Sequence, residues 1–296
     1  MSANGILCLD KPPEMTSFSC CAVMRRLLGT KKVGHAGTLD PNATGVLPIL
    51  SGSATRALDF LPDHDKEYVA SLRFGAVSDT LDVWGEVTET DKPRPTRGAT
   101  EAALAAFRGE ILQVPPMMSA LKRGGVRLYE LARRGEVVER EARPVTVYEL
   151  ELLEMDEAAG TATLRCRCSK GTYIRTLCDD LGQALGCGAV MTALRRTLAA
   201  GFSEQDALSL EEARRLSEAG ELHSRLIPVE TALSCYPAVT VTEKQAVRFQ
   251  NGGALARERL PGEVPEGLCR VYGPAGFLGL GRPAAEELTV ARLFKE

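Results

Sequence analysis

Two stretches of the chain alternate hydrophobic and polar side chains, and a period of two residues predicts half-buried β-strands. The stretches are 67–74 and 161–168, and each has four hydrophobic residues on one face. A strand shows this pattern when one face packs on a core and the other meets solvent. We therefore expect both strands in the main sheet. The hydrophobic positions are Tyr68, Ala70, Leu72, Phe74, Ala162, Leu164, Cys166 and Cys168.

A helical period follows the second strand, and one charged residue departs from it. Residues 169–172 lead into a predicted helix whose hydrophobic positions recur every three or four residues. Arg175 lies off this stripe, in the first turn, where the helix dipole disfavours a cation. Either an anionic partner elsewhere holds Arg175, or Arg175 lies on a surface that tolerates it. The stripe consists of Ile174, Leu177, Leu181 and Leu185.

Further short elements complete a mixed pattern. We expect a helix over 18–28 that begins at a Thr16 or Ser17 cap and ends before Gly29. The order of elements predicts an α+β (mixed α/β) fold. The other predicted strands are 6–9 and 190–196, and the other predicted helices are 54–61, 100–108 and 210–219.

Two segments differ from the rest of the chain in composition and in their predicted elements. The stretch 114–148 opens on two prolines, carries basic residues and contains one predicted helix, 128–134. We expect it to be an excursion from the main sheet, suited to lie on a partner. From Tyr236 onward, short strands and a small helix with Thr242 and Gln245 as its capping box predict a β-rich module. We therefore expect a large domain, 1–230, and a small one, 236–296.

Composition limits the compartment and the cofactors. The chain has a net charge of −3 and no apolar run of about 18 residues that could span a membrane. The N-terminus lacks the basic and then apolar pattern of a signal peptide, so we expect a cytoplasmic protein. The nine cysteines form no C-x-x-C pair and only three histidines are present, so we expect free thiols and no metal site.

The charges are unevenly distributed along the chain. Residues 1–56 carry six basic and three acidic side chains, and 122–143 carry seven and four, whereas 203–230 carry three and seven. A basic face attracts phosphate even on an acidic protein. Ordinary solvated charge clusters are the alternative.

The stretch 34–48 carries an acid and an imidazole among three glycines and two prolines. Glycine permits positive φ, and proline fixes φ and removes a donor, so we expect a loop of specified shape without a regular strand. Asp40 and His35 are its candidate functional residues. Taken alone, Asp40 before Pro41 is typical of a turn cap.

This stretch resembles the catalytic-aspartate motif of the TruB family of tRNA pseudouridine synthases, and the resemblance extends over nearly the whole chain. Beyond residue 236 the chain resembles the PUA RNA-binding domain. Two positions depart from the family pattern: Glu14 stands where glycine is usual, and Met118 stands where an aromatic residue is common. The further family-like segments are 9–12, 66–68, 119–122, 143–148, 169–175 and 194–197.

The resemblance implies a fold and an activity. The fold is a catalytic domain built on a central, mostly antiparallel sheet flanked by helices, plus a small β-barrel-like PUA domain. The activity is isomerisation of uridine 55 in the T loop of tRNA to pseudouridine. This reaction breaks the bond from C1′ to N1 and rebonds the uracil through C5, so it needs no redox cofactor, metal or ATP. The implied partner is the T-arm stem-loop of tRNA, and the enzyme is a monomer without an obligate protein partner or a membrane.

The resemblance also assigns roles to single residues. Asp40 is the nucleophile, and Arg175 is the cation that keeps this carboxylate ionised in a closed pocket. Tyr68 stacks on the flipped-out base and takes the C5 proton, whereas the alternative for Tyr68 is a core tyrosine with a satisfied hydroxyl. The residues that line the base pocket are Tyr173 and Leu194, and the residue that enters the T loop is His35.

Other readings remain open at this point. A binding module that folds or escorts tRNA would use the same basic segments. A guide-RNA-dependent relative of the family would need partner proteins and a stable RNA. A hydrolase that uses Asp40 is disfavoured because no second carboxylate has a matching spacing. Attack at C1′, attack at C6 and proton abstraction to a glycal are equally compatible with the residues.

Overall fold

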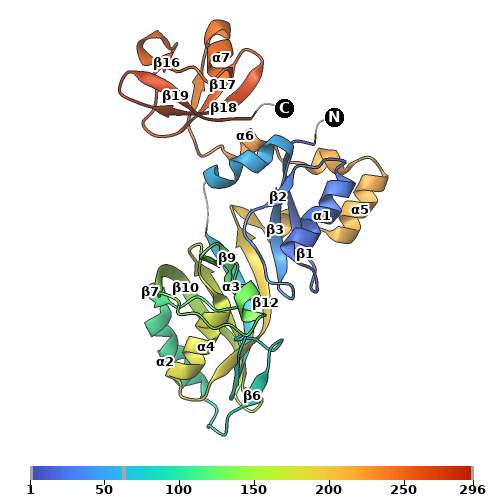
Figure 1. Ribbon diagram of the computed structural model, residues 1–296, viewed down its shortest axis with the longest axis vertical. Coiled ribbons are helices and arrows are strands. Elements are labelled where there is room, and N and C mark those ends of the chain that lie inside the picture. The colour runs from blue at the N-terminus through green and yellow to red at the C-terminus, as the bar shows by residue number, and fades with distance from the viewer. Residues whose placement is uncertain (1–2, 62–64, 295–296) are drawn as a thin grey trace. The chain divides into compact units, whose positions relative to one another are not determined.

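The computed structural model describes residues 3–61 and 65–294, which form two compact units (Figure 1). The start of the predicted domain 1–230 and the end of the predicted domain 236–296 lie outside the described residues, and the boundary between the two domains stays a prediction. Within the described residues, the first unit consists of 3–41, 47–61 and 205–294, and the second unit consists of 42–46 and 65–204.

The first unit is built on a small sheet in the order β14-β1-β3, with β2 paired to β3. The pair β1 and β14 is parallel, and the pair β2 and β3 is antiparallel. Helices α1 and α5 lie side by side against this sheet (Figure 1) and share one hydrophobic core with it. The elements are β1 (Gly5–Lys11), α1 (Ser17–Leu27), β2 (Val33–His35), β3 (Thr44–Ser51), β14 (Ala207–Ser209), α5 (Leu210–Glu218), η4 (Leu222–Arg225) and α6 (Val229–Ala232).

Two predicted helices of this unit have different outcomes. Helix α1 begins at the Thr16 cap, where the Thr16 side chain accepts a hydrogen bond from the Ser19 N–H. The prediction is therefore confirmed. The predicted helix 54–61 is a 3₁₀ helix, η1 (Gly52–Phe60), which starts earlier than predicted. The side chain of its N-cap residue, Ser51, does not cap it, and the Ser53 N–H donates instead to Asn4 Oδ1 at 2.7 Å.

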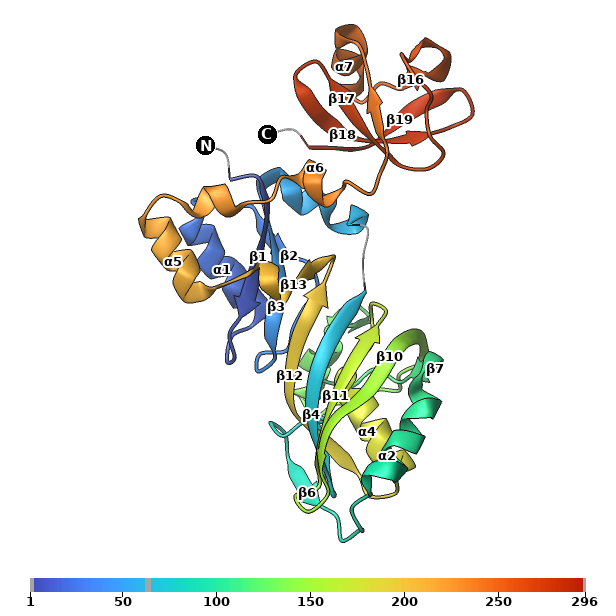
Figure 2. The same cartoon turned by 180° about the vertical axis from the view of Figure 1, so that it is seen from behind.

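The second unit is a run of antiparallel strands in the order β12-β4-β11-β10-β7. The two strands predicted from alternation are neighbours, β4 (Lys66–Phe74) and β11 (Thr161–Cys168), and their predicted hydrophobic faces are buried. Helices α4 and α2 pack against this sheet (Figure 2), so the α+β fold is confirmed. The other elements are β5 (Ala76–Ser78), β6 (Val87–Glu89), α2 (Arg97–Leu104), η2 (Ala105–Phe107), β7 (Gly109–Gln113), β10 (Arg143–Asp156), α4 (Ile174–Ala184), β12 (Ala189–Ala199) and β13 (Phe202–Ser203), and η3 (Glu204–Asp206) follows them.

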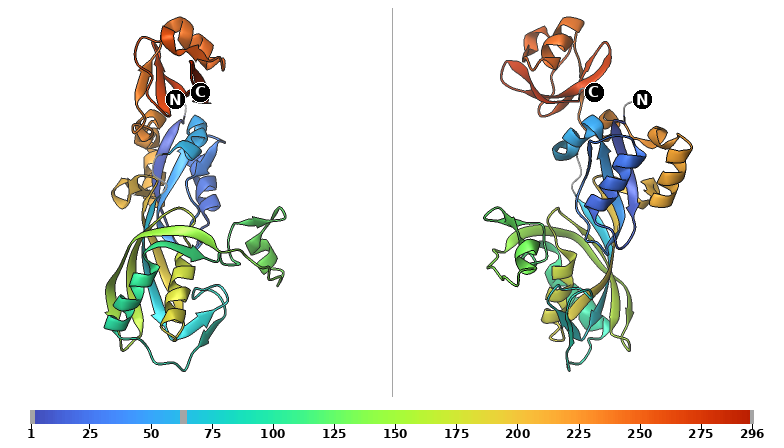
Figure 3. Two further views of the ribbon diagram at one scale, coloured as in Figure 1. Left: turned by 90° about the vertical axis from the view of Figure 1, so that its left-hand side faces the viewer. Right: turned by 45° about the vertical axis from the view of Figure 1, so that its right-hand side comes forward.

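The excursion from the sheet is shorter than predicted. Strand β10 begins at Arg143 and its first five residues pair with β7, so the expected end at 148 is wrong. We call the remaining segment, 114–142, the insert, and Figure 3 shows it projecting from the sheet of the second unit. Its hairpin turns at Gly124 and Gly125, whose φ values are 58° and 86°. The elements of the insert are β8 (Lys122–Arg123), β9 (Val126–Arg127) and α3 (Leu128–Ala132).

The predicted β-rich module is a separate five-stranded sheet in the order β15-β17-β18-β19-β16. Helix α7 carries the predicted capping box of Thr242 and Gln245, and Phe249 on this helix is fully buried in the core of the module. The curled sheet fits a PUA-like domain. The elements are β15 (Ala238–Thr240), α7 (Glu243–Gln250), β16 (Leu255–Ala256), η5 (Arg257–Arg259), β17 (Cys269–Gly273), β18 (Gly276–Pro283) and β19 (Glu287–Leu293).

The stretch 34–48 is more regular than predicted. Strand β2 reaches His35 and β3 begins at Thr44, so only 36–43 form a loop. Pro48 lies within β3, where its carbonyl accepts a hydrogen bond from the Ala36 N–H at 2.9 Å. A proline lacks only the donor, so it can still accept at this position in a strand.

All nine cysteines are free thiols, as predicted, and eight of them are buried. Among the described residues, no helix is long and apolar enough to cross a membrane. Within the same residues, no group of three or more His, Cys, Asp or Glu side chains could hold a metal ion.

Candidate active site

The loop that carries Asp40 is held on both sides of this residue. Ser17 Oγ accepts from the Leu39 N–H at 2.9 Å and donates to the Leu39 carbonyl at 3.3 Å. Lys11 Nζ donates to the Pro41 carbonyl at 2.8 Å, and the Lys11 side chain is fully buried. A buried ammonium group is stable only when it is hydrogen-bonded, so this contact holds the loop firmly. The half-buried Asp40 therefore stands on a backbone with little freedom.

The strand after this loop approaches β12 closely. In the second unit, Thr44 and Gly45 pair in parallel with Arg195 and Arg196 of β12. The Arg196 side chain is fully buried, and its Nε donates to the Val46 carbonyl at 2.8 Å. Gly45 has a φ of 100°, a conformation that side chains rarely adopt. Glycine is thus required where the motif enters the sheet.

His35 is placed by the first unit. It ends β2, opposite Ile49 of β3, and its side chain is half-buried. The first unit therefore holds both His35, at the end of β2, and Asp40, which lies five residues later in the following loop.

Tyr68 and Leu194 lie on the same face of the second unit's sheet. Leu194 of β12 is opposite Ala70 of β4, and Ala70 is two residues after Tyr68. Side chains in this diagonal relation are about 7–8 Å apart, within reach of an aromatic ring. Tyr68 and Leu194 are 6% and 8% exposed, so both can line one apolar pocket.

The beginning of β4 is electropositive. Burial lowers the pKa of the Lys66 ammonium, and the nearby charges of Arg196 and Lys170 lower it further. Like charges this close together raise the electrostatic cost of keeping Lys66 protonated. Lys66 precedes Tyr68 by two residues and Arg196 is opposite Tyr68 in the pair of β4 and β12, so these cations border the proposed base pocket.

Arg175 is buried, so the alternative that it lies on a tolerant surface is wrong. The residue is 5% exposed. It lies in the first turn of α4, two residues after the half-buried Tyr173. Its Nη1 donates to the Thr80 carbonyl at 3.2 Å, and its Nη2 donates to the Met118 carbonyl at 2.8 Å. Its Nε lies 3.8 Å from Asp82 Oδ2, so an anionic partner is present. The ion pair of Arg175 with Asp40 stays a prediction.

Asp82 is the site residue that the sequence analysis missed. It is 7% exposed, and its Oδ1 accepts from the Thr80 hydroxyl at 2.7 Å and from the Trp84 N–H at 3.1 Å. The preceding Leu81 has a φ of 65°, a strained value for a leucine. The turn thus presents the Thr80 carbonyl and the Asp82 carboxylate to the same guanidinium. The compact polar turn around 78–85 was the available signal.

The chain matches models of one protein family along most of its length. Residues 25–174 match the model described as TruB family pseudouridylate synthase, N terminal domain. Residues 175–234 match the tRNA pseudouridylate synthase B C-terminal domain, and 237–294 match the C-terminal model of pseudouridine synthase II TruB. The fold and the matched models define the class as pseudouridylate synthases.

Proteins named tRNA pseudouridine synthase B are similar in sequence to this chain over nearly its full length. The tRNA pseudouridine synthase B of Caulobacter vibrioides is 42% identical, over 99% of this chain and 97% of its own. That of Chromohalobacter salexigens is 47% identical, over 94% of this chain and 89% of its own. The chain belongs to the TruB family.

Solved structures share the fold. A structure of an H/ACA ribonucleoprotein bound to a substrate RNA containing 2′-deoxyuridine has a chain that is 25% identical, with a TM-score of 0.74. The match covers 99% of this chain and 86% of that one. A Cbf5-Nop10-Gar1 complex has a chain that is 27% identical, also with a TM-score of 0.74, covering 99% and 85%.

Proposed function

We propose that this chain converts uridine 55 in the T loop of tRNA into pseudouridine, with Asp40 as the nucleophile. The observation that carries the proposal is the similarity to tRNA pseudouridine synthase B, at 42–47% identity over 94–99% of the chain. The clamped loop supports the assignment of Asp40, because a nucleophile must be held at a defined place to attack a fixed sugar or base.

The other site residues supply what this reaction needs. Arg175 keeps the Asp40 carboxylate ionised, since a nearby cation favours the charged form of an acid. Tyr68 stacks on the flipped uracil and removes the C5 proton, while Tyr173 and Leu194 close the pocket against water. Flipping a nucleotide costs a few kcal/mol, which aromatic stacking partly offsets. His35 occupies the space that the base leaves.

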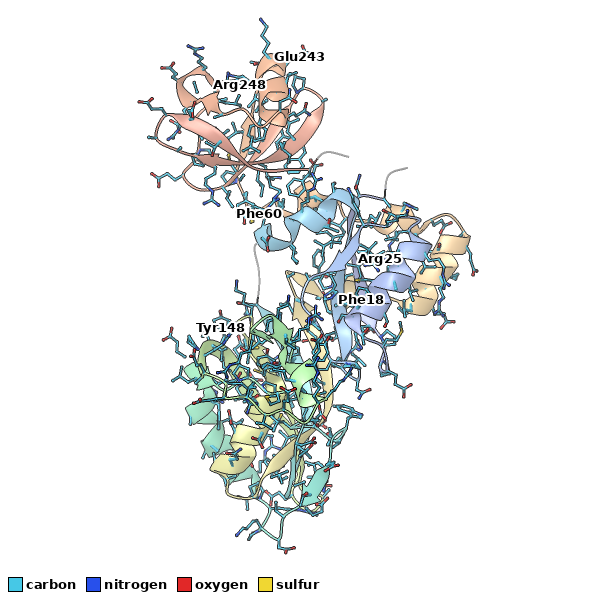
Figure 4. All side chains as sticks on the ribbon, viewed as in Figure 1. Phe18, Arg25, Phe60, Tyr148, Glu243 and Arg248 are labelled. Carbon is cyan, nitrogen blue, oxygen red and sulfur yellow. The ribbon has the colours of Figure 1, made fainter. Side chains whose placement is uncertain are left out.

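Several exposed surfaces suit the RNA backbone. Phe18 of α1 is 67% exposed, and the guanidinium carbon of Arg25 lies 5.2 Å from its ring centroid (Figure 4). Arg25, Arg26 and Lys31 line a hollow of about 600 Å³ next to it. Within the part of the chain that the structure describes, none of these cations pairs with a carboxylate. Together with the insert and the module 236–294, this surface binds phosphates, and binding weakens as salt rises.

The enzyme acts without a guide RNA or a protein partner. The chain is 42–47% identical to enzymes named tRNA pseudouridine synthase B, but only 25–27% identical to the chains of the H/ACA and Cbf5 complexes. The insert adds its own RNA surface. In it the guanidinium carbons of Arg127 and Arg133 lie 5.8 and 5.4 Å from the centroid of the Tyr129 ring. Turnover of bare tRNA by the purified chain tests this independence.

The central experiment compares Asp40→Asn with wild type on a T-arm stem-loop labelled with tritium at C5 of uridine. We expect tritium release to be abolished while affinity for the stem-loop is retained. Asp59→Asn is the control, because Asp59 is an exposed aspartate of the same unit. Retained turnover in Asp40→Asn would refute the nucleophile assignment.

A second candidate function is the folding or escorting of tRNA, which the exposed cations and Tyr129 of the insert favour. Restoration of normal tRNA function in cells by Asp40→Asn would show that binding suffices. Failure of this variant in cells, with binding intact, would leave the isomerase as the main activity.

A further inference from the structure

The side chain of Gln113 forms two hydrogen bonds with one peptide group of the proposed site. Gln113 ends β7 and is 2% exposed. Its Oε1 accepts from the Tyr173 N–H at 3.0 Å, and its Nε2 donates to the Tyr173 carbonyl at 3.2 Å. The amide thus pairs with the Tyr173 backbone as a neighbouring strand would, and both of its polar atoms are satisfied in a buried place.

The clamped residue begins helix α4. Tyr173 is the N-cap of α4, with a φ of −102° and a ψ of 108°, and its side chain does not cap the helix. A helix start needs partners for its free N–H groups. Gln113 supplies one of them from another strand. The direction in which the Tyr173 ring leaves the backbone therefore depends on a residue 60 positions away in the chain.

Gln113 is also the base of the insert. The insert leaves β7 directly after Gln113 and returns at Arg143, and these two residues are opposite each other in the sheet. Five residues after Gln113, the Met118 carbonyl accepts from Arg175. The segment that we propose to grip RNA is therefore bonded at its root to both Tyr173 and Arg175.

We propose that Gln113 is a positioning residue of the isomerase, which holds Tyr173 against the flipped base and so sets the rate of the chemical step without contributing to RNA affinity. This inference rests on the proposed function. Gln113 is 2% exposed, so it offers almost no surface to the RNA. It acts through the Tyr173 peptide.

The test is Gln113→Glu, which keeps the shape of the side chain and the acceptor for the Tyr173 N–H. Assayed at a pH above the pKa of the new carboxyl, it replaces the donor by a carboxylate oxygen that faces the Tyr173 carbonyl. We expect the single-turnover rate on the labelled T-arm stem-loop to fall by about 10- to 100-fold, because a buried acceptor is left unsatisfied. The dissociation constant should change by less than about twofold, as for other residues that do not touch the ligand.

Leu112→Glu is the matched control, since Leu112 precedes Gln113 on the same strand and is 70% exposed. It adds the same charge without touching Tyr173, and it should leave the rate unchanged. Gln113→Asn serves if Gln113→Glu folds poorly: it keeps the amide but is one methylene shorter, so the rate should still fall.

A double-mutant cycle separates positioning from a general structural role. In a Tyr173→Ala background, Gln113→Glu should lower the single-turnover rate by less than about twofold, because the effects of two residues that act through one another are not additive. An equal loss in both backgrounds, an unchanged rate in Gln113→Glu, or a loss explained by weaker binding would each overturn the inference.

Hydrogen exchange of the backbone amides of 170–176 tests the clamp, the pair of hydrogen bonds between Gln113 and the Tyr173 peptide, independently of activity. Exchange should be faster in Gln113→Ala than in wild type, and unchanged exchange would overturn the clamp. If wild type makes no pseudouridine while exchange responds as expected, the proposed function fails and the clamp stands.

Discussion

Replacing Gly45 by alanine tests how closely β3 and β12 must approach each other after the Asp40 loop. A Cβ built on Gly45 would lie 2.2 Å from the carbonyl oxygen of Arg196 and 2.9 Å from its nitrogen. Both atoms belong to the backbone of β12, so no side chain can move aside. Because interiors are close-packed, the strands would have to part by roughly 1 Å.

The expected cost combines strain and crowding. A side chain at positive φ costs about 1–2 kcal/mol, and an extra carbon in a packed interior costs about 1–3 kcal/mol. The lower entropy of alanine in the unfolded chain returns about 0.4–1 kcal/mol. We therefore expect Gly45→Ala to lower the free energy of unfolding by about 1–5 kcal/mol, with a central value of about 3 kcal/mol, a large effect for one residue.

Urea unfolding followed by tryptophan fluorescence measures this loss. The chain has one tryptophan, Trp84, which lies in the same unit as Gly45 and reports on that unit. With a typical slope of about 1–3 kcal/mol per molar urea, the midpoint should fall by about 1 M or more at the central value of this loss.

Gly34→Ala is the matched control in the same motif. Gly34 does not have the left-handed φ of Gly45, and the nearest atom to its added Cβ would be Thr55 Cγ2 at 3.9 Å, an ordinary contact. Because Gly34 lies in the first unit, its unfolding is followed by far-UV circular dichroism, and its midpoint should match wild type. An unchanged midpoint in Gly45→Ala would refute the reasoning, and an equal loss in both variants would assign the effect to alanine itself.

Three further predictions concern separate regions. Glu14 has a φ of 62° where the family usually has glycine, so Glu14→Gly should raise the thermal midpoint slightly. Relief of about 1–2 kcal/mol of strain exceeds the entropy cost of glycine, about 0.5–1 kcal/mol, and a lower midpoint would contradict this. Burial raises the pKa of Asp180 from 3.8 to about 6. Between these two pH values the folded state keeps a proton that the unfolded chain has lost. The contribution of this carboxyl to the free energy of unfolding therefore falls as pH rises from 3.8 to about 6. Asp180→Asn should therefore be more stable than wild type at neutral pH but not below pH 3.8, and an equal gain at both would contradict the assignment. Charge reversal of Arg26 and Lys31 should weaken tRNA binding. The slope of log K against log salt concentration should become shallower by about 0.7–0.9 for each phosphate that the protein no longer neutralises. The control, Arg214→Glu on the acidic helix α5, should leave this slope unchanged.

Local patterns were sufficient to predict most elements of the fold. The alternation along β4 and β11, the Thr16 cap of α1 and the Thr242 box of α7 are all confirmed. Each depends on residues within a few positions of one another, so the chain determines it without long-range contacts. The stretch 34–48 was harder to predict because the pairing of β2 and β3 overrides the local preference of its glycines and of Pro48.

Long-range contacts decided the environment of Arg175. Its position off the hydrophobic stripe predicted either an anionic partner or a tolerant surface, and nothing local could choose between them. The structure places it among the Thr80 carbonyl, the Met118 carbonyl and Asp82, the first two of which are 95 and 57 residues away. A cation is buried only where such partners converge.

The sequence by itself determined the kinds of chemistry that the protein carries: one aspartate in a specified loop, an arginine at a helix start and a tyrosine on a strand. The tertiary structure decided how firmly each is held. Lys11 and Ser17 pin the backbone around Asp40, and Gln113 pins Tyr173. These contacts join residues far apart in the chain, and a hydrogen bond between distant residues leaves no period or spacing in the sequence from which it could be predicted.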